Sequence, residues 1–76
     1  MTDRRTFVQQ HSLNQVQNAI DQAVYGDDNK RIMVNLFIRN STYEAEADNE
    51  HISVRGLHKR VKKIYPAFEN YLNKLN

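Results

Sequence analysis

The segment 30–39 constrains the fold more than any other part of the sequence, because it is strongly apolar and its periodicity decides between strand and helix. Its alternate positions are apolar and often β-branched: Ile32, Val34, Leu36 and Ile38. Alternation of this kind lines one face of a β-strand. The polar residues 39–42 that follow are typical of a turn. We therefore predict a strand over residues 30–39, followed by a hairpin.

The register of this hairpin supports a sheet. A two-residue loop at positions 40–41 places the apolar residues of the first strand opposite those of the next, which are Tyr43, Ala45 and Ala47. A second tight turn at positions 49–50 adds a third strand over residues 51–55, and its Ile52 and Val54 extend the same face. Because both registers agree on one apolar face, they predict a three-stranded antiparallel meander.

Two helices flank the predicted sheet. Ser12 and Gln15 have the spacing of a capping box, and apolar residues recur at helical spacing from Leu13 until Gly26, which predicts a helix over residues 13–25. After Gly56 a second helical stripe runs to the carboxyl end through Leu57, Val61, Ile64, Phe68, Tyr71 and Leu75. Pro66 lies inside it and lacks an amide donor, so we expect a kink or a short break there.

The predicted fold class is therefore α+β, with the order αβββα and both helices packed on one sheet face. A chain of 76 residues has room for one hydrophobic core, and without cysteine that core is held by packing or by association. We assign residues 12–76 to a single domain and residues 1–11 to an N-terminal segment in which Phe7 and Val8 either dock or fray. The alternative is an all-helical fold with a helix over residues 28–40, since a helical face also fits Ile32, Met33, Leu36 and Phe37.

Charge is segregated along the chain. All the charged residues of 41–54 are acidic, whereas 55–63 holds a basic run of Arg55, His58, Lys59, Arg60, Lys62 and Lys63. Cations at the amino end of a helix oppose its dipole, so local stability does not explain the run. Phosphate groups would be attracted there. The sequence thus predicts nucleic-acid binding, to RNA or DNA, through backbone phosphates. The alternative is a solvated face in which Arg55 pairs with Glu44 across the strands.

The predicted element order, with lysines opening the last helix, is similar to that of double-stranded RNA-binding domains. The lysine-rich helix start of that family is matched loosely by His58, Lys59, Val61 and Lys62. Tyr65 and Pro66 stand where that family has small residues, and the short turn at 40–41 replaces its long loop. The resemblance implies a shared architecture and slightly favours RNA as the partner.

A second hypothesis concerns the outer face of the predicted sheet. Met33 and Phe37 point to that face, where no helix is left to cover them, which suggests a contact surface for a protein partner or for a second copy of the chain. The predicted partner interface consists of Met33, Asn35, Phe37, Glu44 and Glu46. In this alternative the protein is a small interaction module, an inhibitor or adaptor that can form a homodimer.

Several classes of function find no support. The three histidines are scattered, the acidic residues Glu44, Glu46 and Asp48 alternate as on a solvated strand, and no nucleophile or phosphate-loop motif occurs. We therefore expect no enzyme activity, no metal and no cofactor. No apolar run is long enough for a signal peptide or a membrane span, and cysteine is absent, so we expect a cytoplasmic protein without a membrane partner.

Overall fold

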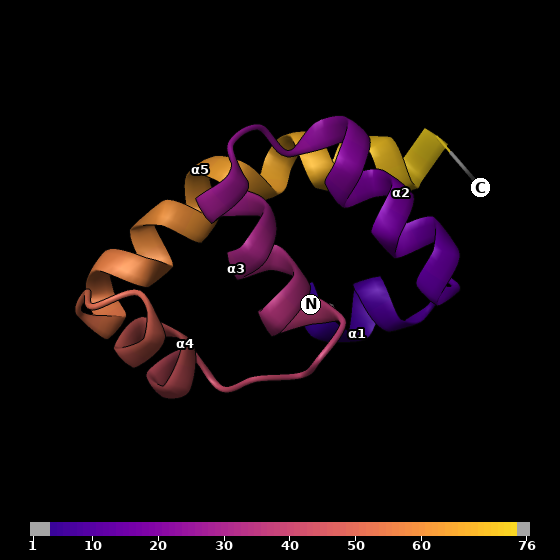
Figure 1. The fold of residues 1–76 in the computed structure, drawn as a ribbon. Coiled ribbons are helices and arrows are strands. Elements are labelled where there is room, and N and C mark those ends of the chain that lie inside the picture. The colour runs from indigo at the N-terminus through magenta and orange to yellow at the C-terminus, as the bar shows by residue number, and fades with distance from the viewer. Residues whose placement is uncertain (1–3, 75–76) are drawn as a thin grey trace.

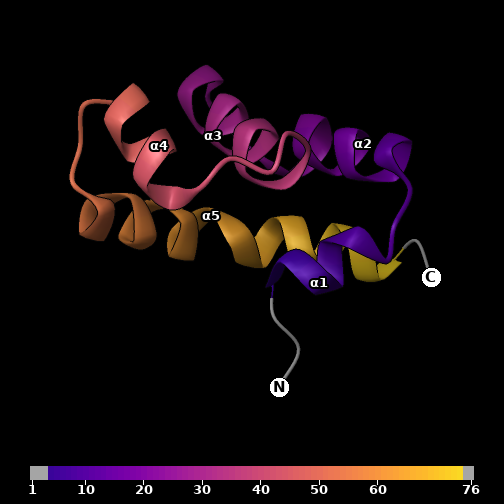
Figure 2. The ribbon, with the colours of Figure 1, turned by 90° about the horizontal axis from the view of Figure 1, so that it is seen from below.

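The computed structural model describes residues 4–74, and every regular element in it is a helix (Figure 1). The helices are α1 (Arg4–Gln9), α2 (Leu13–Ala23), α3 (Asp27–Phe37), α4 (Tyr43–Asn49) and α5 (Val54–Lys74). Helix α5 lies along one side of the molecule, and α2, α3 and α4 are arranged along its length on the other (Figure 2). Both α2 and α4 pack against α5, α3 contacts α2 and α4, and α1 packs against α3.

The predicted three-stranded sheet is wrong, because no strand occurs between residues 4 and 74. Residues 30–37 are helical in α3, and their burial follows a period near 3.6, with Ile32, Met33, Leu36 and Phe37 buried. Val34 and Ile38, which a strand would have placed on the core face, are only partly buried. The α+β class and the architectural resemblance to double-stranded RNA-binding domains are therefore both wrong. The all-helical alternative, which placed a helix near residues 28–40, agrees with α3.

The two predicted hairpin loops are turns between helices. After α3 the chain turns at Asn40, whose φ is +58°, and after α4 it turns at His51, whose φ is +57°. Thr42 caps the start of helix α4, and its hydroxyl accepts a hydrogen bond from the Ala45 amide at 3.1 Å. Before α5, the Ser53 hydroxyl accepts from the Gly56 amide at 3.0 Å. Each hydroxyl satisfies an amide that has no partner inside its helix.

Both predicted helices are present. In α2, the Gln15 amide donates to the Ser12 hydroxyl and the Ser12 amide donates to the Gln15 side chain, which confirms the capping box. Helix α5 begins at Val54, before Gly56, and it continues through Pro66 as one helix, so of the predicted kink or short break the break is wrong, and the kink stays a prediction. Pro66 and Lys62 are both exposed, so water can satisfy the Lys62 carbonyl that loses its helical partner.

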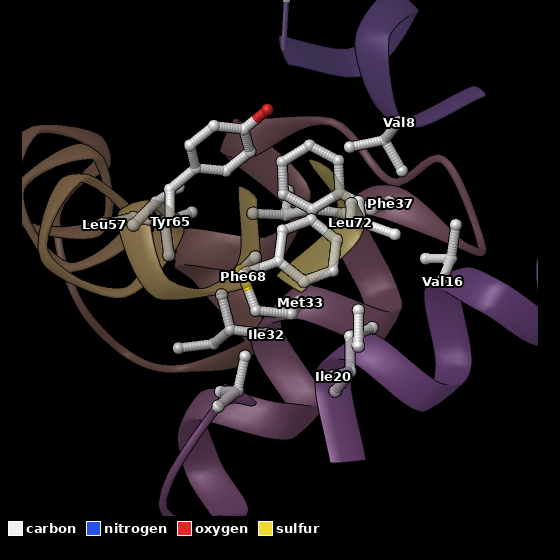
Figure 3. Packing of buried hydrophobic residues seen from close by; sticks show 14 of the residues in the cluster. Val8, Val16, Ile20, Ile32, Met33, Phe37, Leu57, Tyr65, Phe68 and Leu72 are labelled. Atoms are coloured by element: carbon white, nitrogen blue, oxygen red, sulfur yellow. The ribbon is translucent and has the colours of Figure 1, made fainter. Parts of the chain in front are cut away.

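The core lies between α5 and the other helices, and side chains from all five contribute to it (Figure 3). Three aromatic rings form its centre: the Phe37 ring lies 5.9 Å from the Tyr65 ring and 5.8 Å from the Phe68 ring, between centroids. Aromatic rings at these separations gain about 0.5–1.5 kcal/mol per pair beyond the burial of their area. These contacts join the end of α3 to the middle of α5.

Helix α1 docks on this core. Val8 is buried, and one terminal nitrogen of the Arg5 guanidinium donates to the carbonyls of Leu36 at 3.1 Å and Ser41 at 2.9 Å. The two carbonyls lie at the end of α3 and in the link to α4, where a helix end leaves such groups without internal partners. Of the two alternatives for the N-terminal segment, docking describes residues 4–9.

One fully buried side chain in the core carries a carboxylate. Glu46 of α4 is 0% exposed, and neither of its carboxylate oxygens has a hydrogen-bond partner within residues 4–74. The ordinary requirement is that a buried charge be paired or hydrogen-bonded. Glu46 therefore costs the fold free energy that an apolar side chain of the same size would not.

Candidate functional site

Four basic side chains of α5 share one face. Arg55, Lys59, Lys62 and Lys63 are all exposed, and at 3.6 residues per turn they fall within an arc of about 100° around the helix axis. The opposite face carries the buried residues of α5, among them Leu57, Val61 and Phe68. We call these four residues the α5 stripe; at 1.5 Å rise per residue it is about 12 Å long.

The α5 stripe has no partner within the part of the chain that the structure describes. None of its four side chains makes a hydrogen bond or an ion pair there, and the ion pairs found in that part both belong to Arg31, with Asp28 and Glu50. The predicted pairing of Arg55 with Glu44 across two strands is therefore wrong. The positive charges of the stripe are therefore exposed and have no ion-pair partner in residues 4–74.

The other two residues of the predicted basic run are used differently. The Arg60 side chain is partly buried, and its Nε donates to the Asn29 side chain at 3.1 Å, which turns the guanidinium toward α3. The His58 ring stacks on the Tyr43 ring of α4, with 4.2 Å between centroids and 7° between planes. The structure thus brings together four of the six predicted phosphate-binding residues.

The strongest ion pair tethers the end of α4. Arg31 donates from Nε to one Glu50 oxygen at 2.9 Å and from Nη2 to the other at 3.0 Å, and it also pairs with Asp28 at 2.9 Å. The hydrogen bond from Arg31 lowers the pKa of Glu50, and the same interaction raises that of Arg31. This geometry is bidentate, and it removes Arg31 from the set of free cations.

The predicted partner interface is dispersed. Met33 is 0% and Phe37 5% exposed, so the expectation that they are uncovered is wrong: the outer face of the sheet does not exist, and the two side chains lie in the core. Glu46 is buried too, Asn35 is partly buried, and Glu44 is exposed. Among residues 4–74, the large apolar side chains that are exposed are Leu13 at 66% and Tyr25 at 82%. Sequence reasoning had placed both in the first helix and assigned neither to the surface.

A pocket that sequence reasoning missed opens where α1, the link from α3 to α4, and α5 meet. Its volume is about 470 Å³, and it is lined by Arg4, Arg5, Phe37, Thr42, Tyr43, Glu44 and His58. We call it the Arg pocket. The Arg4 guanidinium lies over the Tyr65 ring, 5.0 Å from its centroid. The adjacent arginines are visible in the sequence, but only the docking of α1 brings them to His58.

Other kinds of site are not seen in residues 4–74. No three histidine, aspartate or glutamate side chains gather there as metal ligands would, and none of the helices combines the length and apolarity needed to cross a membrane. Comparison with protein-family models, with curated proteins and with solved structures gives no match.

Proposed function

We propose that this chain is a small, non-enzymatic, cytoplasmic protein that binds double-stranded nucleic acid by its backbone phosphates, and that the α5 stripe is the contact surface. The observation that carries the proposal is the exposure of four cationic side chains on one helix face, none with a partner among the described residues. Charges this close repel one another, and a row of phosphates would compensate them.

The dimensions of the stripe suit a duplex. Each strand of a duplex presents one phosphate per 3.4 Å of axis, so a stripe of about 12 Å faces about three or four phosphates. Arg55 also lies in the first turn of α5, where the helix dipole disfavours a cation, and an anionic partner would relieve that cost. Backbone contacts of this kind position a protein on nucleic acid but do not read its sequence.

Because the phosphate backbone is the target, we expect duplex RNA and duplex DNA to bind alike. The preference for RNA rested on an architecture with a sheet, and the helical fold removes that support. The alternative of a protein-interaction module, homodimeric through a sheet face, loses its support in the same way, because Met33 and Phe37 are buried. The charge of the α5 stripe is independent of both arguments.

A salt titration with matched variants tests the proposal. The test variant changes Lys59 and Lys62 to glutamine, and the control variant changes Arg39 and Lys74, which are exposed but lie outside the stripe, so that both lose two positive charges. Labelled duplex RNA and duplex DNA are titrated at several salt concentrations. The slope of log affinity against log salt should flatten by about 1.8 units in the test variant, about 0.9 for each lost contact, and remain near the wild-type value in the control.

Two results would count against the proposal. Equal weakening by both variants would mean that net charge, and not the α5 stripe, attracts the nucleic acid. Absence of salt-sensitive binding by the wild-type chain at low ionic strength would mean that the stripe is only a solvated face. Thermal unfolding of both variants serves as the folding control, and we expect little change because all four substituted residues are exposed.

A further inference from the structure

The Arg pocket has the size of a small-molecule site. Its volume of about 470 Å³ falls in the range of about 300–1,000 Å³ that such sites occupy. It combines aromatic surface, from Phe37 and Tyr43, with charged groups from α1. Sites for small molecules in proteins typically pair apolar walls with a few polar groups that fix the orientation of the ligand.

Positive charge exceeds negative charge among the described residues that line this pocket. Glu44 lines the same space, but it forms no ion pair with either arginine. The described contact of the Arg4 guanidinium is with the face of the Tyr65 ring, and its N–H groups have no hydrogen-bond partner among residues 4–74. Two guanidinium groups therefore face one carboxylate across the pocket.

Arg5 is held in place by the backbone. One of its terminal nitrogens donates to two main-chain carbonyls, those of Leu36 and Ser41, and its other N–H groups have no partner among residues 4–74. A guanidinium has five N–H donors in a rigid plane, so fixing one end presents the rest in a set direction. The pocket thus contains a preorganised donor, and little side-chain freedom is lost when an anion binds to it.

We infer that the Arg pocket binds a phosphate monoester. A monoester carries a charge of about −1.5 to −2 at neutral pH and three acceptor oxygens, which matches two guanidinium groups lining one pocket better than a carboxylate does. Arg4 and Arg5 hold the phosphate, an N–H of the His58 ring is a further donor, and the organic part of the ligand rests against Tyr43 and Phe37. The site goes beyond the proposed duplex binding, because neither arginine belongs to the α5 stripe.

The ligand has two sources with the same chemistry: a free nucleotide, or the phosphorylated end of a nucleic-acid strand. The first test uses the wild-type chain, labelled with ¹⁵N, and titrates it with adenosine monophosphate, with inorganic phosphate and with adenosine. The monophosphate should shift the amides of Arg5, Tyr43 and His58, and adenosine at the same concentration should shift them far less, because it lacks the phosphate that the arginines hold. Equal effects of adenosine and the monophosphate, or shifts confined to the α5 stripe, would overturn the inference.

Paired variants then test the arginine. Arg4→Gln should weaken binding of the monophosphate about tenfold or more, as expected when a charged hydrogen bond is lost. Lys74→Gln removes the same charge from the last turn of α5, about 24 Å along the helix from His58, and should change the affinity less than about twofold. Equal effects of the two changes would overturn the inference. Arg5 is left intact because its bonds hold α1, and if Arg4→Gln does not fold, the wild-type comparison with adenosine decides.

Oligonucleotides with and without a 5′-phosphate identify the source. Tighter binding of the phosphorylated strand than of the free monophosphate, lost in Arg4→Gln, supports a strand end; equal affinity for the two supports a free nucleotide. The result is separable from that of the proposed function. Lys59→Gln with Lys62→Gln should leave the affinity for the monophosphate unchanged, and Arg4→Gln should leave the salt dependence of duplex binding unchanged.

Discussion

Replacement of Glu46 by methionine should stabilise the protein. The carboxylate is 0% exposed and has no hydrogen-bond partner in residues 4–74, so the folded state loses the hydration that the unfolded chain retains. Methionine is also unbranched, has a similar length and adapts to irregular space, so it can occupy the same volume without a polar group. Glu46→Met removes the cost and keeps the packing.

The expected gain combines two opposing effects. An unsatisfied buried polar group costs about 1–3 kcal/mol, and a charged one costs more. Against this, Glu46 lies in the first turn of α4, where a negative charge contributes about 0.3–1 kcal/mol through the helix dipole. The net expectation is a gain of about 1–3 kcal/mol. For a domain of this size, each kcal/mol raises the melting temperature by about 4–8 °C.

Glu44 provides the matched control for this substitution. It belongs to the same first turn of α4, but it is exposed. Glu44→Met should therefore lose only the dipole contribution and lower the stability by about 0.3–1 kcal/mol. Urea and thermal unfolding of both variants measure the difference. If Glu46→Met lowers the melting temperature as much as Glu44→Met does, the buried Glu46 carboxylate does not destabilise the folded state, and the cost that we assign to its burial is wrong.

Three further substitutions test other parts of the structure. Arg31 lowers the pKa of Glu50 below its ordinary value of 4.5, and a depressed carboxyl pKa contributes stability that is lost as the pH falls through the folded-state value. Below about pH 4, the urea midpoint of Arg31→Gln should therefore fall less than that of the wild type. Parallel curves of urea midpoint against pH would contradict this. Pro66→Ala should raise the free energy of unfolding by about 1–3 kcal/mol, because it restores an amide donor in an uninterrupted helix; an unchanged urea midpoint would contradict the cost that we assign to the proline. Gly26→Ala should lower the free energy of unfolding by about 1–3 kcal/mol, because φ is +93°, although a Cβ would meet the Asn29 side-chain nitrogen only at an ordinary contact distance of 3.7 Å; a rise in melting temperature would show that the backbone relaxes there.

The amphipathic helices could be predicted where the sequence offers one periodicity only. In α2, Ser12 and Gln15 mark the start and the apolar positions fit no strand. In α3, six of the seven residues 32–38 are apolar, so a period of two and a period of 3.6 both find a complete face. The agreement of two hairpin registers then favoured the period of two, and hence the strand, which is wrong. The better signal was in residues 43–49, where alanine, glutamate, aspartate and asparagine are poor strand formers and Thr42 is a good cap.

The candidate sites were predictable only as far as they are local. The α5 stripe follows from a basic run on a helix whose apolar face is clear, so its residues could be identified before the fold was known. Arg60 belongs to the same basic run, but it donates a hydrogen bond to Asn29, which lies 31 residues away in the sequence, and so is not part of the stripe. The Arg pocket depends on Arg5 reaching Leu36 and Ser41 across similar separations. A single sequence carries no signal for contacts of that kind.

The Arg pocket contains its two arginines only in those molecules in which α1 is docked. Six residues are too few to hold a helix alone, so α1 stays in place through Val8 and the two bonds of Arg5. When α1 detaches, both guanidinium groups leave together, and no partial pocket remains to retain an anion. The measured dissociation constant then equals the intrinsic one divided by the docked fraction. A substitution such as one at Val8, which loosens α1 but lies outside the pocket lining, should therefore lower the affinity for the ligand in proportion to the docked fraction that is lost.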